Sequence, residues 1–67
     1  MRLCIIVLKR PYKFIKGYKC GQYYVNFGKI IRETQKAILF ESYCYGSLIA
    51  WIPKSVIIKI IPIEQLI

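Results

Sequence analysis

The sequence contains no His and no Asp, and its acidic residues are Glu33, Glu41 and Glu64. It therefore lacks parts of a catalytic triad, a His-based proton shuttle, a carboxylate metal cluster and a zinc site of mixed ligands. Its 67 residues also leave no room for a second domain or a deep active-site cleft. The sequence predicts one domain over residues 1–67 that binds a partner and is not an enzyme, with no catalytic residue, metal or cofactor.

Long apolar runs and cysteine pairs are also scarce. The run Leu3–Leu8 is shorter than a signal-peptide core, and no segment approaches the roughly 20 apolar residues that span a bilayer. Cys4, Cys20 and Cys44 show no two-residue spacing of a metal or redox motif. We interpret them as reduced, mostly buried thiols and expect a protein of the host-cell cytoplasm without a transmembrane segment.

Positive charge, in contrast, is abundant and unevenly placed. The net charge is +8, and residues 1–32 hold eight Lys or Arg and no acid, whereas residues 33–67 hold three of each sign. Five of the cations fall between residues 9 and 19. This asymmetry predicts an anionic partner, which can be nucleic acid, a phosphorylated ligand, an acidic protein surface or anionic lipid. The alternative is a solvated face that binds nothing.

The residue types favour strands, because β-branched and aromatic residues dominate and no capping box precedes a helical pattern. Residues 10–21 are expected to form a basic loop or distorted hairpin, Gly28 a bend or bulge, and residues 34–35 and 45–47 turns. The pattern predicts an all-β small barrel or sandwich, with the first strand buried on both faces at Ile5–Leu8. The expected strands are residues 2–9, 22–27, 36–43, 48–52 and 56–63, and residues 29–33 are expected as a further short strand or as a kinked extension of residues 22–27.

The apolar content of 57% exceeds what so small an interior can hold. In the last strand, alternation places Ile57 and Ile61 on one face with Lys59, and Ile58 and Ile60 on the other. A barrel has one inside, so the remaining face is predicted to contact a partner. We therefore expect a homodimer with Ile58 and Ile60 at the interface.

Residues 50–57 read AWIPKSVI, and they resemble the end of a Src-homology-type small β-barrel, with a strand, a Pro, one 3-10 turn and a closing strand. The resemblance implies an all-β, five-stranded Src-homology-like barrel with a 3-10 turn before the last strand. The proline-binding members place an aromatic ring at the position of Val56 and carry an acidic loop. This chain has neither, so proline-peptide binding is not implied.

A second resemblance covers about residues 27–58. Residues 27–39 read FGKIIRETQKAIL and residues 51–55 read WIPKS. They are similar to a family of short phage and mobile-element proteins with a Glu-Thr-x-Lys-Ala-hydrophobic strand pair followed by Trp-hydrophobic-Pro-Lys-Ser. The resemblance implies a viral or plasmid origin and a role in host takeover, counter-defence or nucleic-acid handling.

Cations and aromatic rings alternate in the first half of the chain. Nucleic-acid binding uses this combination, because cations neutralise phosphates and exposed rings stack on bases. The alternative is a half-buried hairpin whose rings are core residues. The candidate anion- or nucleic-acid-binding residues here are Lys9, Arg10, Tyr12, Lys13, Lys16, Tyr18, Lys19 and Tyr23.

The turn at residues 53–55 supplies two further candidates. Lys54 and the Ser55 hydroxyl can meet a phosphate near exposed backbone N–H groups. The alternative is a structural corner in which Trp51 packs in the core and Ser55 caps the turn. We also expect a weak surface ion pair between Glu33 and Lys36.

These observations predict a non-catalytic binding protein of viral or mobile-element origin, which engages nucleic acid through its basic N-terminal half. One alternative is a counter-defence protein that inhibits a host enzyme or sequesters a phosphorylated signal nucleotide. A second alternative is a structural subunit of a ribonucleoprotein or virion.

Overall fold

The computed structural model describes residues 2–44 and 46–65, and this part of the chain is all-β apart from two single-turn 3-10 helices. The all-β prediction is confirmed. Of the turn predicted at residues 45–47, Tyr45 lies outside the described residues. The elements are β1 (Arg2–Leu8), β2 (Tyr18–Cys20), β3 (Tyr23–Glu33), β4 (Ala37–Ser42), β5 (Leu48–Pro53), η1 (Lys54–Val56), β6 (Ile57–Pro62) and η2 (Ile63–Gln65).

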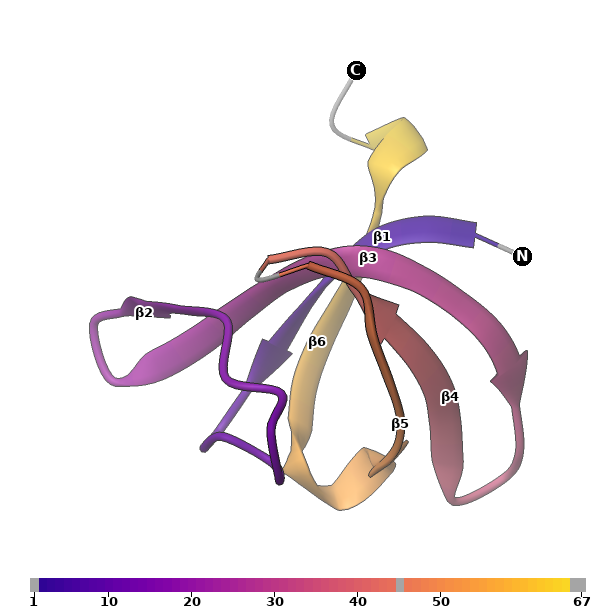
Figure 1. Cartoon of the computed structure of the whole chain (residues 1–67), viewed down its shortest axis with the longest axis horizontal. Helices are drawn as coiled ribbons and strands as arrows, with labels where there is room; N and C mark the ends of the chain where they lie inside the picture. The colour runs from indigo at the N-terminus through magenta and orange to yellow at the C-terminus, as the bar shows by residue number, and fades with distance from the viewer. Residues whose placement is uncertain (1, 45, 66–67) are drawn as a thin grey trace.

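The strands form one antiparallel sheet in the order β5-β4-β3-β1-β6, and β2 adds to β3 beside this path. The long strand β3 pairs with β1 over its first part and with β4 over its last part (Figure 1). Within residues 2–44 and 46–65 no ladder joins β5 to β6, so the sheet is open. The predicted 3-10 turn is present as η1, directly before β6.

One face of the sheet carries the core. Alternate residues of β1 point into this core. They pack with residues of β3, β4 and β5, with Val56 of η1 and with Ile15 of the loop after β1, and residues of β6 pack against them. Ile5 and Val7 point the other way and are only half-buried, so the prediction that Ile5–Leu8 is buried on both faces is wrong. The described chain covers one face of this sheet, as in many antiparallel sheets. The core consists of Cys4, Ile6, Leu8, Ile15, Ile30, Ile38, Phe40, Ile52 and Val56.

Strand β3 runs unbroken through Gly28, where the sequence predicted a bend or bulge, so residues 29–33 extend the preceding strand and do not form a separate one. A Cβ on Gly28 would lie 1.9 Å from the carbonyl oxygen of Glu41 and 2.8 Å from the Phe40 ring. Glycine is therefore needed here for the close approach of β4 and its buried ring. The irregularity falls later, between Ile30 and Arg32, where the pairing with β4 shifts by one residue.

The side chain of Trp51 on β5 does not point where the sequence predicted. The register pairs Ile52 with Ile38 and Trp51 with Leu39, so Ile52 points into the core and Trp51 away from it. Ile52 is fully buried, whereas Trp51 is 42% exposed. The interpretation that packed Trp51 in the core is therefore wrong, because successive side chains of a strand point to opposite faces.

The opposite face of β3, β1 and β6 is apolar as well. Direct cross-strand partners place Phe27, Ile5 and Ile61 in one row, and Val25 and Val7 begin the next. A solvated sheet face normally carries polar residues, so this surface is a candidate contact region. We define the outer face as Leu3, Ile5, Val7, Val25, Phe27 and Ile61.

Candidate nucleic-acid interface

Residues 9–17 connect β1 to β2 (Figure 1), and Lys19 lies on β2 itself. We call residues 9–19, with their five cations, the basic loop. All five are exposed, and none takes part in an ion pair among the described residues. Their charge is therefore uncompensated by the fold and available to an anionic ligand. The structure brings together on this loop the predicted residues Lys9, Arg10, Lys13, Lys16 and Lys19.

The basic loop is fastened to the sheet at two places. At its start, the backbone N–H of Lys9 donates to the carbonyl of Val56 at 2.9 Å, which places Lys9 beside η1. In its middle, Tyr12 and Ile15 exchange two backbone hydrogen bonds of 3.0 and 2.9 Å and close a tight two-residue turn. The Ile15 side chain is 1% exposed and belongs to the core, so the turn is held in place by apolar burial.

A buried polar group holds the end of the basic loop. The Asn26 side chain is fully buried; its Nδ2 donates to the Lys16 carbonyl at 3.3 Å, and its Oδ1 accepts from the Ser42 hydroxyl at 3.0 Å. Gly17 lies against it with φ +76°, and a Cβ there would come within 2.4 Å of Asn26 Nδ2. This position therefore needs glycine for both its backbone angle and its space. Sequence analysis missed Asn26, because a lone Asn in a strand pattern carries no signal of its burial.

The aromatic residues of this region divide into supporting and exposed rings. Tyr12 is half-buried against the core, and the Lys13 ammonium lies 5.6 Å from its ring centroid. Tyr18 and Tyr23 are 58% and 39% exposed. Phe14, at the turn between Tyr12 and Ile15, is 51% exposed, although it was not among the predicted site residues. Its alternation with Ile15, which is buried, is the sequence signal that could have found it.

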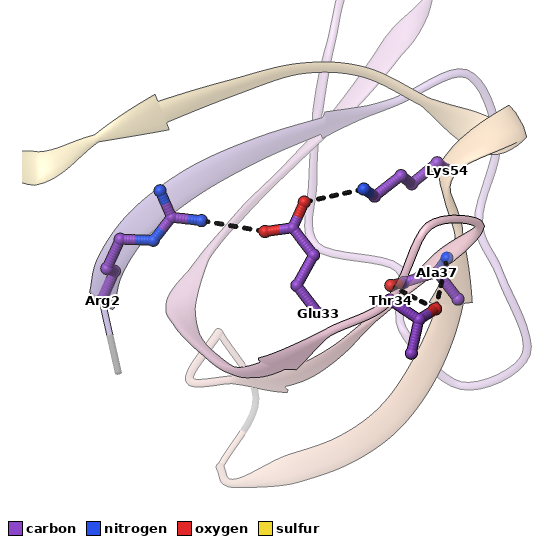
Figure 2. Close-up of polar contacts among 5 residues, drawn as sticks. All are labelled: Arg2, Glu33, Thr34, Ala37 and Lys54. Carbon is purple, nitrogen blue, oxygen red and sulfur yellow. Dashed lines mark hydrogen bonds and ion pairs between the residues drawn. The ribbon is translucent and has the colours of Figure 1, made fainter.

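The second predicted anion site, Lys54 with Ser55, has a different electrostatic setting. The Lys54 ammonium donates to Glu33 Oε2 at 2.7 Å, and Arg2 contacts Glu33 Oε1 at 3.2 Å from the other side (Figure 2). These cations lower the pKa of Glu33, first through the Lys54 hydrogen bond and then through the Lys54 charge. The charge of Lys54 is thus compensated within the fold, unlike that of the basic loop.

The predicted ion pair between Glu33 and Lys36 is absent among the described residues, since the Glu33 carboxylate contacts Arg2 and Lys54 instead (Figure 2). Thr34 and Ala37 close the turn after β3 through hydrogen bonds of the Thr34 hydroxyl. The turn is therefore closed locally, while Glu33 joins β1 to η1. Proximity in sequence suggested Lys36, whereas the sheet brings the termini of distant elements together.

Ser55, the remaining predicted member of that site, is exposed, and no side-chain hydrogen bond caps η1. The capping role considered for Ser55 is therefore absent. Its neighbour Lys54 instead donates its backbone N–H to the Lys36 carbonyl at 2.8 Å. The turn is thus held by backbone contacts, and the Ser55 hydroxyl lies at the surface.

Strand β6 departs from simple alternation. Leu8 pairs with Ile57 and Val7 with Lys59, so a bulge inserts Ile58 between them. The bulge places Ile57 and Ile60 against the core and leaves Ile58 44% exposed. The prediction that Ile58 and Ile60 share one face is therefore wrong, because an inserted residue inverts the pattern beyond it.

Of the three free thiols, Cys4 is buried, Cys44 half-buried and Cys20 exposed, so the prediction of mostly buried thiols holds only for Cys4. Burial raises the pKa of the Cys4 thiol. Within residues 2–44 and 46–65, no three His, Cys, Asp or Glu side chains gather as metal ligands, and no helix is long and apolar enough to cross a membrane. Comparisons of the chain with protein-family models, curated proteins and solved structures gave no match.

Proposed function

We propose that this protein is a non-catalytic binding protein that engages nucleic acid through the basic loop. The observation that carries the proposal is the contrast in charge compensation: the five loop cations are exposed and without ion-pair partners in the described chain, while Arg2, Lys29 and Lys54 pair with carboxylates. Uncompensated cations on an anchored loop release counterions when they meet phosphates, which drives association.

Two features favour nucleic acid over a small phosphorylated ligand. The loop cations are spread over eleven residues, which comprise the connection between β1 and β2 and the start of β2, so they can contact a series of phosphates. Exposed Tyr18 and Tyr23 stand on the adjoining β2–β3 hairpin, where they add ring surface for bases. A counter-defence inhibitor of an acidic host enzyme, a protein that sequesters a signal nucleotide and a ribonucleoprotein or virion subunit are the alternatives.

The resemblance of residues 27–58 to short phage and mobile-element proteins supports a viral or plasmid origin and action in the host cytoplasm. The strand order supports the five-stranded Src-homology-like barrel. Strands β5 and β6 form the two edges of the sheet, and only η1 separates them in the sequence. Closing the barrel requires the sheet to curl until these two edges meet.

We further propose that the homodimer forms through the outer face and not through Ile60, which packs on the core. The central row of this face, Phe27, Ile5 and Ile61, carries no charge. Lys29, in the row of Leu3, lies 3.7 Å from Glu41, and Lys59, which has no ion-pair partner among the described residues, lies on the edge strand in the row of Val7. Two copies can therefore meet there without like-charge repulsion at the centre. Sedimentation of the wild type against Phe27→Glu tests this: a dimer that the variant converts to a monomer supports it, and a monomeric wild type contradicts it.

The nucleic-acid proposal is tested with two variants that lose the same number of positive charges at different places on the protein. Replacing Lys13, Lys16 and Lys19 with Gln removes three loop charges, and replacing Arg32, Lys36 and Lys59 removes three exposed charges elsewhere. Binding of a labelled oligonucleotide is measured by fluorescence anisotropy between about 50 and 200 mM salt.

We expect the loop variant to lose about a hundredfold in affinity, and its slope of log K against log salt to fall by about two to three. The control variant should keep most of its affinity. Equal losses in the two variants would show that net charge alone matters, and wild-type binding by a folded loop variant would overturn the proposal. Failure of the wild type to bind any oligonucleotide would favour an acidic protein or a nucleotide as ligand.

A further inference from the structure

The turn at the apex of the basic loop has an unusual backbone. Tyr12 and Ile15 are its paired ends, and Lys13, its first central residue, has φ +53°. This position of a two-residue hairpin normally belongs to Gly, Asn or Asp, because a side chain such as Lys is strained at positive φ. Strain of this kind persists where the surrounding structure imposes it, and it is concentrated at binding sites.

This turn presents one aromatic ring to solvent. Phe14 is 51% exposed, whereas Ile15 next to it is 1% exposed and Tyr12 is half-buried against the core. The neighbours on both sides are thus fixed by packing, and the hydrogen bond from Asn26 to the Lys16 carbonyl fixes the following segment. Phe14 is therefore a ring held outward on a supported turn, and an exposed ring at such a place indicates a contact residue.

The charges around Phe14 describe the ligand. Lys13 and Lys16 flank it in sequence and are exposed, and no carboxylate pairs with either in the described part of the chain. A partner that fits must offer a flat apolar face close to negative charge. An unpaired nucleobase with its phosphates has both, whereas the bases of a duplex are stacked on one another and present only their edges.

We propose that Phe14 stacks on an unpaired base and that the ligand of the basic loop is a single-stranded nucleic acid. This inference rests on the proposed function and narrows it from nucleic acid in general to single strands. The loop cations contact the backbone on either side of the stacked base, so stacking and phosphate contact contribute separately. A ring without charge affects affinity but not the salt dependence.

The experiment compares the two ring positions and the two ligand forms. The probes are a fluorescein-labelled oligothymidylate of about 12 nucleotides and a duplex of the same length, with anisotropy as the readout. Phe14→Leu removes the ring and keeps an apolar side chain. Trp51→Leu is the matched control, because Trp51 is also an exposed ring, at 42%, but lies on β5, outside both the basic loop and the outer face. Phe14→Trp tests rescue, and circular dichroism verifies that each variant is folded.

We expect the wild type to prefer the single strand by about tenfold or more, and Phe14→Leu to lose about 5- to 100-fold on the single strand alone. Its salt slope should stay at the wild-type value. Trp51→Leu should bind normally, and Phe14→Trp should bind at least as well as the wild type. Equal binding of duplex and single strand, with no loss in Phe14→Leu, would overturn the inference and leave the proposed function standing. If neither probe binds, both are overturned, and the exposed ring becomes a contact for an acidic protein.

Discussion

The basic loop and the β4–β5 hairpin use the same residue types in opposite ways. Phe14 in the loop is 51% exposed, whereas Phe40 in β4 is fully buried. The cations of the loop have no ion-pair partner in the described chain, whereas Glu41 of the hairpin interacts with Lys29, Tyr43 and Ser47.

These contacts in the hairpin lower the pKa of Glu41, and the hydrogen bond from Ser47 has the largest effect. In the loop, by contrast, the five cations have no ion-pair partner among the described residues, and the Phe14 ring is exposed. The two regions therefore differ in how far contacts within the fold satisfy their charges.

The largest expected effect is on stability and compares Phe40 with Trp51. Phe40→Ala should lower the free energy of unfolding by about 3–5 kcal/mol, because it removes a buried ring and leaves a cavity. Trp51→Ala should cost about 1 kcal/mol or less, because Trp51 is 42% exposed on the other face of the sheet. Urea denaturation followed by far-UV circular dichroism measures both.

Phe40→Leu is the milder variant that keeps this comparison measurable if Phe40→Ala does not fold. The two positions lie on neighbouring strands and differ in burial. A Trp51→Ala protein destabilised as strongly as Phe40→Ala would therefore show that Trp51 is covered in solution. Contact through a second copy would then be tested by repeating the measurement at several protein concentrations.

A smaller effect is expected from the polar anchor of the basic loop. Asn26→Ala should lower stability by about 1–3 kcal/mol, because the buried Ser42 hydroxyl and the Lys16 carbonyl each lose a hydrogen-bond partner. Hydrogen exchange over residues 12–19 should quicken more than exchange in β4, and oligonucleotide affinity should fall as the loop loses its preorganised shape. Gln22→Ala, in an exposed turn, is the control. Unchanged loop exchange in Asn26→Ala would contradict the anchoring role.

The smallest effect concerns pH and Glu33. The folded protein holds the pKa of this carboxylate below its ordinary value of 4.5 through Lys54 and Arg2. The unfolded chain therefore binds the proton more readily, and the stabilisation is present above pH 4.5 and is lost as pH falls through the lowered pKa. Glu33→Gln should flatten the decline of stability in this acidic range, as measured by thermal melts at several pH values. An identical pH dependence in wild type and variant would show that the ion pairs do not persist in solution.

The regular part of the fold was predictable because strand periodicity is local. The strand expected at residues 36–43 is present as β4, and its alternate residues Ile38 and Phe40 are buried. The prediction failed where the alternation within one strand is changed by contacts with a strand that is distant in the sequence. The bulge at Ile58 and the close approach of β4 to Gly28 depend on neighbouring strands, and neither can be recognised from the sequence of the strand that contains it.

The candidate site shows the same division. The sequence predicted the five cations of the basic loop, because clustered charge is a property of composition alone. It missed Phe14 and Asn26, since exposure at a turn and burial in a strand depend on what packs beside them. The sequence pattern also assigned Lys54 to a phosphate site. It did not predict the ion pair between Lys54 and Glu33, which are 21 residues apart in the chain.

The sequence by itself determined the all-β character and the location of excess charge, because these follow from residue types and short-range periodicity; from that charge it also predicted an anionic partner. The tertiary structure decided which cations remain uncompensated and which rings remain exposed. Both depend on contacts between residues far apart in the chain: Glu33 meets Arg2 and Lys54 through the pairing of strands, and Ile15 enters the core while Phe14 stays outside. Pairing of distant residues is a property of the sheet register, which no single segment of the chain specifies.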